Sequence, residues 1–132
     1  MSESPLAAPR IVDKPWGREI WYADNPPYAG KVLEVKAGRR LSLQLHEVKE
    51  ETLYLLSGLV KLTFVPAGDD ASPSERTFEW RPGQFVHIPP RTVHRFEAVE
   101  DAVLLEVSTP HLTDVIRLED DYARPKTDQP QG

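Results

Sequence analysis

Four polar side chains that could hold a metal ion lie in two short stretches of this sequence. Gln44 and His46 are two residues apart, Glu51 follows soon after, and His94 ends the stretch 83–94. Residues two apart on a β-strand point to the same side, so Gln44 and His46 can face one interior. Two imidazole nitrogens, a carboxylate and an amide oxygen suit Zn²⁺, Mn²⁺, Fe²⁺, Co²⁺ or Ni²⁺. Water or substrate would complete the coordination, as it does at catalytic metals.

Short β-strands must bring these residues together, because the surrounding pattern has a period of two. Within residues 40–47, three alternating leucines fall on one face and Gln44 and His46 on the other. Further strands are expected at residues 29–36, 51–57, 59–65, 76–80, 84–88, 94–99 and 102–108. Glycine and proline turns separate these stretches. Many short strands at near-even spacing predict an all-β sandwich or closed barrel.

The length of 132 residues and the hydrophobic content of 39% fit a single domain with one packed core. We expect that domain to span residues 11–124, with flexible, proline-containing tails at 1–10 and 125–132. Residues 66–76 are expected to form the longest loop. Residues 111–119 are expected to form a short helical or irregular closing segment.

Charge and composition limit the partners. The net charge is −5 and the pI is about 5.4, which argues against nucleic acid or an anionic membrane as the main partner. The absence of cysteine excludes disulfides, thiolate ligands and cysteine nucleophiles. The N-terminus lacks a signal-peptide pattern, and no apolar run approaches the roughly 18 residues of a membrane helix. We therefore expect a cytoplasmic protein.

Residues 38–58 and 83–94 resemble the paired motifs of the cupin superfamily, which contain glycine, His-x-His, glutamate and glycine, and then glycine, proline and histidine. Gln44 stands where most cupins have their first histidine, and Arg91 stands where many have glycine. The resemblance implies one cupin-type (jelly-roll) β-barrel and a homodimer. It also implies one divalent metal ion held by Gln44, His46, Glu51 and His94.

The run from Gln44 to Lys49 resembles the Gln-x-His-x-x-Lys signature of mannose-6-phosphate isomerases, in which the glutamine is a zinc ligand. Residues 14–17, Lys-Pro-Trp-Gly, resemble the opening motif of those isomerases. Residues 94–97 and 114–124 resemble segments of the type II members, so the resemblance spans about residues 11–124. It implies zinc as the first choice of metal and a sugar or sugar phosphate as substrate. Residues 47 and 48 depart from the pattern, because type II isomerases carry further histidines there.

Two residues near the motifs are candidates for proton transfer. Lys49 matches the lysine of the isomerase signature, and His87 precedes the second proline turn. Either side chain, or a metal-bound hydroxide, could move a proton between C1 and C2 of a sugar. The ordinary alternatives are a solvated turn lysine and an exposed strand histidine. Gln44 has an alternative too, since a buried amide can simply form hydrogen bonds.

Arginines could bind a substrate phosphate through their planar, bidentate guanidinium groups. Arg40 and Arg95 are the first candidates, with Arg39 and Arg91 as neighbouring alternatives. On a small acidic protein such arginines more commonly form surface ion pairs.

Three functions fit these features. The first is an aldose–ketose isomerase whose metal polarises the substrate carbonyl. The second is another metal-dependent cupin enzyme, such as an iron dioxygenase. The third is a non-enzymatic module that binds a sugar or another small molecule. The glutamine-containing signature favours the first.

Overall fold

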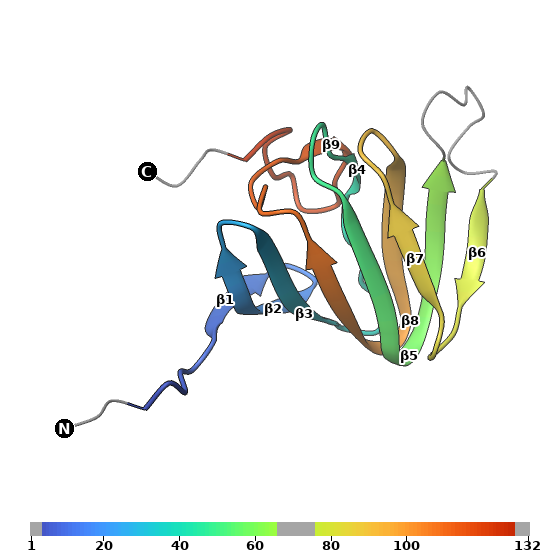
Figure 1. The fold of residues 1–132 in the computed structure, drawn as a ribbon. Coiled ribbons are helices and arrows are strands. Elements are labelled where there is room, and N and C mark those ends of the chain that lie inside the picture. Colours follow the sequence, from blue (N-terminus) through green and yellow to red (C-terminus); the bar gives the residue numbers. More distant parts are fainter. Residues whose placement is uncertain (1–3, 66–75, 129–132) are drawn as a thin grey trace.

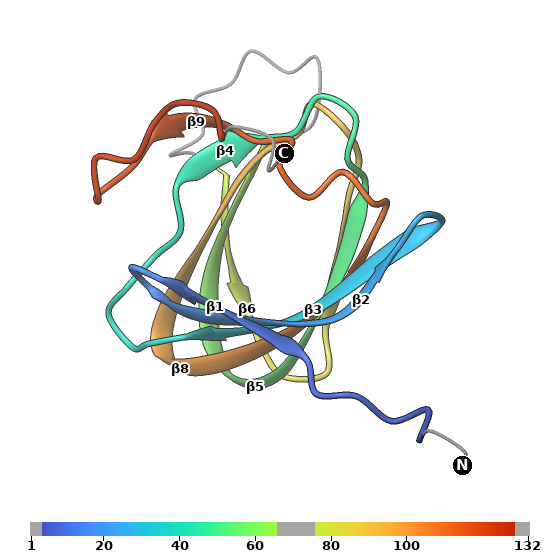
Figure 2. The same ribbon diagram turned by 90° about the vertical axis from the view of Figure 1, so that its left-hand side faces the viewer.

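Alternating burial along extended strands organises this protein, as the period of two predicts. The computed structural model describes residues 4–65 and 76–128. The strands of this described part are β1 (Arg10–Lys14), β2 (Gly17–Asn25), β3 (Tyr28–Val35), β4 (Leu43–Leu45), β5 (Glu51–Val65), β6 (Thr77–Trp80), β7 (Phe85–Ile88), β8 (Val93–Ser108) and β9 (Ile116–Glu119). They form one antiparallel sheet that curls into a barrel (Figures 1 and 2), which confirms the expected all-β barrel.

Two long, bent strands carry the barrel. β5 and β8 pair with each other over most of their length, from Glu51 with Ser108 to Val65 with Val93. The short strand β4 pairs with β8 at Gln44 and His94. Each long strand merges two shorter strands expected from the sequence. The bend of β5 falls at Gly58, where the register shifts and φ is +94°. A Cβ at Gly58 would lie 2.3 Å from the carbonyl oxygen of Asp101, so only glycine fits this crossing.

The first two strands, β1 and β2, were not among the expected ones, and they form a hairpin whose turn contains the Lys-Pro-Trp-Gly motif. Trp16 is buried at 2% exposure, and its carbonyl accepts a hydrogen bond from the Lys36 amide. Gly17 has a φ of +155°, and a Cβ there would overlap the Glu34 carbonyl oxygen. The motif thus fixes the hairpin tightly against β3.

Apolar side chains fill the barrel between its walls. The most deeply buried include Leu33, Leu53, Leu55, Ile88 and Leu104, each at 2% exposure or less. Trp16, Trp80 and Phe96 add large aromatic surfaces to the same cluster. Burial of this apolar area is the main force that holds the curled sheet together.

The C-terminal segment crosses one end of the barrel, at the top of Figure 2. Residues 111–115 form turns, and β9 then pairs with β4, so the closing segment is extended and contains no helix. Within the expected tail, Lys126 accepts a backbone hydrogen bond from Arg117, and Thr127 bridges Ile116. Residues 66–75 of the expected long loop lie outside the described residues. Across 4–65 and 76–128, no helix is long and apolar enough to cross a membrane.

Candidate metal centre

Three of the four expected ligands converge inside the barrel. The ligand atoms of His46, Glu51 and His94 all lie within 4.8 Å of one another. Oε2 of Glu51 is 2.8 Å from Nε2 of His46 and 3.5 Å from Nε2 of His94. All three side chains are at most 4% exposed. His46 follows β4, Glu51 opens β5 and His94 lies at the start of β8, so three neighbouring strand ends position the site.

The far ring nitrogens of both histidines are held by backbone carbonyls. Nδ1 of His46 donates to the Asp114 carbonyl over 2.5 Å, and Nδ1 of His94 donates to the Thr92 carbonyl over 2.9 Å. In the neutral imidazole this leaves a lone pair on Nε2, and both Nε2 atoms face Glu51. Among the described residues, neither Nε2 nor Glu51 Oε2 has a hydrogen-bond partner. Buried atoms left this way cost free energy, and a divalent cation would satisfy all three, so the donor set fits a metal ion.

The protonation states also suit metal binding. Burial lowers the pKa of His94 to about 4, although the charge of Glu51 opposes this shift. Burial alone would raise the pKa of Glu51, but Lys49 and the two histidines hold it well below its usual range. A neutral imidazole and an ionised carboxylate are the forms that bind metals.

Gln44 lines the same cavity as His46 and Glu51. Its Oε1 accepts a hydrogen bond of 2.6 Å from the Ser42 hydroxyl. A carbonyl-type oxygen has two lone pairs, so this bond leaves one available. The structure brings Gln44 to the site, and its role as a fourth ligand stays a prediction.

Lys49 is a buried cation, in contrast to the solvated turn lysine that was the ordinary alternative. Its Nζ lies 3.1 Å from Glu106 Oε2 and 3.7 Å from Glu51 Oε1. Burial would lower the pKa of Lys49, but the two carboxylates raise it above its usual value, so Lys49 stays charged. Sequence reasoning missed Glu106. The signal was present, because Glu106 follows the buried Leu104 at a spacing of two and therefore faces inward.

A small cavity of about 70 Å³ adjoins three of the four expected ligands, Gln44, His46 and Glu51. Part of its wall is apolar and includes Trp16, Leu33 and Phe96. Five cationic side chains also line it, namely Lys14, Lys31, Lys49, Arg117 and Arg124. So do five carboxylates, namely Glu19, Glu51, Glu106, Asp114 and Asp128. The formal charges of these ten groups cancel before any metal ion is counted.

His87 does not join this site. Its side chain is 50% exposed, and Nε2 lies 2.5 Å from Glu50 Oε2 on the outside of the barrel. Its neighbour Ile88 is fully buried, so alternation along β7 turns His87 outward. The expectation that His87 lines the pocket as an acid or base therefore needs correction.

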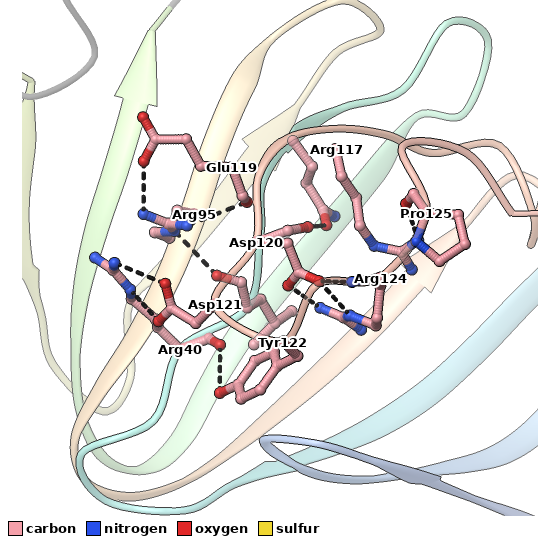
Figure 3. A network of polar contacts seen from close by, with 12 residues as sticks. Arg40, Arg95, Arg117, Glu119, Asp120, Asp121, Tyr122, Arg124 and Pro125 are labelled. Carbon is pink, nitrogen blue, oxygen red and sulfur yellow. Dashed lines mark hydrogen bonds and ion pairs between the residues drawn. The ribbon is translucent and has the colours of Figure 1, made fainter.

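Arg40 and Arg95 also lie away from the cavity, among the polar contacts of Figure 3. Arg40 forms a bidentate pair with Asp121 at 2.7 and 2.9 Å. Arg95 donates to the carbonyls of Leu41 and Glu119. Their guanidinium groups hold the C-terminal segment against the strands. Neither arginine lines the metal cavity, so the structure does not place them where they could bind a substrate phosphate there.

Comparison with known proteins identifies the family. The Cupin domain family matches residues 31–108, more than half of the chain, so this protein belongs to the cupin family. The matched region contains all four expected ligands. No curated protein sequence matches the chain.

Solved structures share the fold at low sequence identity. KdgF from Halomonas sp. aligns with a TM-score of 0.64 and 18% identity over 77% of this chain and 86% of its own. Oxalate decarboxylase from Lactobacillus farciminis, solved as a formate complex, aligns over 83% of this chain with a TM-score of 0.68 and 20% identity. Oxalate decarboxylase from Bacillus subtilis, which has Mn(II) centres, aligns over 89% of this chain with a TM-score of 0.68 and 22% identity. This chain spans only 33% and 35% of the two decarboxylases.

Proposed function

We propose that this cupin binds one divalent metal ion through His46, Glu51 and His94, with Gln44 as fourth ligand, and acts on a small molecule at that ion. The observation that carries the proposal is the set of three buried ligand atoms that face one another without hydrogen-bond partners. A neutral His94 and an ionised Glu51 support it. The formate complex of one structural neighbour supports a small-molecule ligand.

We propose further that the reaction is aldose–ketose isomerisation of a sugar or sugar phosphate. The metal, when bound, supplies the Lewis acidity that polarises the substrate carbonyl. The ammonium of Lys49, fixed beside Glu51, would stabilise the negative charge that develops on the substrate oxygen. Glu106 replaces His87 as the candidate proton acceptor, because it lines the cavity and burial raises its pKa despite the opposing charge of Lys49.

Zinc is the proposed metal, because the Gln-x-His-x-x-Lys pattern resembles that of zinc isomerases. Manganese is the alternative that a structural neighbour supports, since the decarboxylase of Bacillus subtilis has Mn(II) centres. Elemental analysis of the purified protein distinguishes the two metals. A metal stoichiometry near one per chain is expected, and Glu51→Gln should abolish it.

Deuterium exchange tests the proposed isomerisation. Metal-loaded protein in deuterated water should exchange the C2 proton of at least one member of a panel of aldoses, ketoses and their phosphates. The Glu51→Gln variant and chelator-treated protein should not. If fully loaded protein exchanges no sugar in the panel, isomerisation is rejected while the metal site stands. A site that contains only iron and consumes oxygen with substrate would instead favour the dioxygenase alternative.

We propose that the chain forms a homodimer through the outer face of its sheet. A row of apolar side chains crosses six strands there, each residue paired in register with the next. The row consists of Phe85, Tyr54, Leu105, Val32, Ile20 and Ile11. Phe85, Ile11 and Tyr54 are 69%, 47% and 40% exposed. Such a continuous apolar strip is typical of an interface that another surface covers.

A second copy is the proposed occupant, because a two-fold axis can pair one strip with the same strip. Light scattering should give a mass of two chains for the native protein. Tyr54→Lys should convert it to a monomer that still binds metal, and Phe78→Lys, outside the row, should not. A monomeric native protein at high micromolar concentration would reject the dimer.

A further inference from the structure

One of the five cations around the metal cavity forms no ion pair with any residue that the structure describes. The other four each form an ion pair with a carboxylate: Lys31 with Glu19, Lys49 with Glu106, Arg117 with Asp128 and Arg124 with Asp120. The ammonium of Lys14 forms no hydrogen bond or ion pair with any residue in 4–65 or 76–128. Lys14 nevertheless lines the cavity and is half-buried there.

The nearby carboxylates are already engaged. Glu19 accepts hydrogen bonds from Lys31 at 3.2 Å and from the Trp21 indole at 2.8 Å. Burial lowers the pKa of Lys14, and the attraction of Glu19 does not restore it. The charged form of Lys14 is therefore less favourable in this half-buried place than in water.

The backbone holds Lys14 firmly in this position. Lys14 pairs with Gly17 at the end of the β1–β2 hairpin, and the buried Trp16 anchors the turn between them. Trp16 itself lines the same cavity. The backbone of Lys14 is therefore fixed at the cavity wall, which limits the reach of its ammonium to this cavity and its surroundings.

The charge balance of the cavity indicates what this ammonium binds. The five cations and five carboxylates of the lining cancel, so a bound divalent ion gives the cavity a net positive charge. An anionic ligand would restore neutrality in a partly buried place, where charges interact strongly. The arginines first considered for this role, Arg40 and Arg95, are occupied elsewhere.

We infer that Lys14 binds an anionic group, a carboxylate or a phosphate, of the small molecule that enters the metal cavity. The inference rests on the proposed function only in that both concern the same cavity. It assigns to the Lys-Pro-Trp-Gly motif a substrate-binding role in addition to its structural one. It also makes the substrate class an acidic small molecule, such as a sugar phosphate or a sugar acid.

Calorimetric titration with inorganic phosphate and with acetate tests this inference. Both probes are titrated into the native protein and into the variants Lys14→Met, Lys14→Arg and Lys36→Met, the last as control, each with and without metal. Lys36→Met removes the same charge as Lys14→Met, but Lys36 lines a different cavity, so the variant is a matched control. We expect Lys14→Met to weaken binding of the preferred anion about ten-fold or more, Lys14→Arg much less, and Lys36→Met not at all. The probe that binds tighter identifies the phosphate or the carboxylate.

The outcomes separate this inference from the metal proposal. If metal-loaded native protein and Lys14→Met bind both anions equally, or the native protein binds neither, the inference is overturned and the metal site stands. If no metal binds, the proposed function fails. The inference on Lys14 is then tested by comparing anion binding in the metal-free native protein and in Lys14→Met.

Thermal unfolding provides a second, independent readout. Because the charge of Lys14 is unfavourable in the ligand-free cavity, Lys14→Met should melt at the same temperature as the native protein or higher. A clearly lower melting temperature would show that Lys14 holds the structure together, and would overturn a binding role.

Discussion

Nδ1 of His46 donates a hydrogen bond to the backbone carbonyl of Asp114, which lies 2.5 Å away on the C-terminal segment. The Asp114 carboxylate accepts three more, from the amides of Glu47, Val48 and Lys49 at 3.1, 2.7 and 2.8 Å. One residue thus orients the His46 ring and fixes the loop between His46 and β5. Groups that orient metal-binding histidines strongly influence metal affinity. Asp114 is therefore a positioning residue of the metal centre.

The variant Asp114→Ala should weaken metal binding although it changes no ligand. The carbonyl remains, but the three loop amides lose their acceptor, so the loop can move. We expect a loss of about 10- to 100-fold in metal affinity and of about 1–3 kcal/mol in the free energy of unfolding. Competition with a chromophoric chelator measures the first, and urea unfolding measures the second.

Asp101→Ala is the matched control for this experiment. Asp101 also accepts an amide hydrogen bond, from Ala37 at 2.8 Å, but it lines a different cavity. It should lower stability without changing metal affinity. Equal metal affinity in Asp114→Ala and the native protein would reject the positioning role.

The variant Gln44→Ala tests the fourth ligand. If Gln44 coordinates the ion, its removal should weaken metal binding, but less than His46→Ala, because a neutral amide contributes less than imidazole. We expect a loss of about 10-fold for Gln44→Ala. Gln84→Ala is the control, since Gln84 is an amide in a remote turn that accepts from the Arg81 amide. Native affinity in Gln44→Ala would show that its amide serves only the Ser42 hydrogen bond.

The sequence allowed the ligand set to be predicted because local rules determine it. The spacing of Gln44 and His46 places both on one strand face, and the strand starts at Glu51 and His94 return to the same barrel end. The same alternation, applied to Ile88, would have turned His87 outward. The error came from reading the histidine without first deciding which face of its strand is buried.

Long-range pairings could not be predicted in this way. From the sequence, Lys49 resembles an ordinary turn lysine. The structure shows that it faces Glu106, more than fifty residues later in the chain. The sequence likewise gives Arg40 no partner, whereas the structure pairs it with Asp121. The partner in each case lies on a segment whose path is set by tertiary packing, and no local pattern specifies that contact.

The stability of the metal-free protein should depend on pH through His94. Its pKa is about 4 when folded, mainly because of burial, against 6.5 for the ordinary side chain. Between these values the unfolded chain binds more protons than the folded protein. The free energy of unfolding therefore falls as the pH drops from 6.5 to 4, and the full contribution of His94 is present above pH 6.5. The expected loss is about 3 kcal/mol. The ionised Glu51 adds a further loss below its usual pKa.

Urea unfolding in the presence of a chelator, at a series of pH values from 4 to 7, measures this dependence. His94→Asn should flatten the curve over that range, because the titrating group is gone. The control His87→Asn leaves His94 in place and should keep the slope that His94 causes. An unchanged slope in His94→Asn would assign the pH dependence to other groups.

The buried pair of Lys49 and Glu106 should show strong energetic coupling. Lys49→Met leaves Glu106 as a buried carboxylate near Glu51 without its cation, which should cost about 3–5 kcal/mol. The double variant Lys49→Met with Glu106→Leu removes both charges, so we expect it to regain much of that loss. Urea unfolding of the single and double variants without metal gives the coupling energy.

The same variants test whether this buried pair takes part in the proposed reaction as well as in folding. The surface pair of Arg81 and Glu79, at 2.8 Å, is the control and should show coupling of no more than about 1 kcal/mol. The double variant should fold and bind metal, yet it should show no sugar proton exchange, because it lacks both the cation beside the substrate and the proposed proton acceptor Glu106. Strictly additive single effects would show that Lys49 and Glu106 do not depend on each other. Retained exchange in the double variant would reject the proposed reaction roles of both residues.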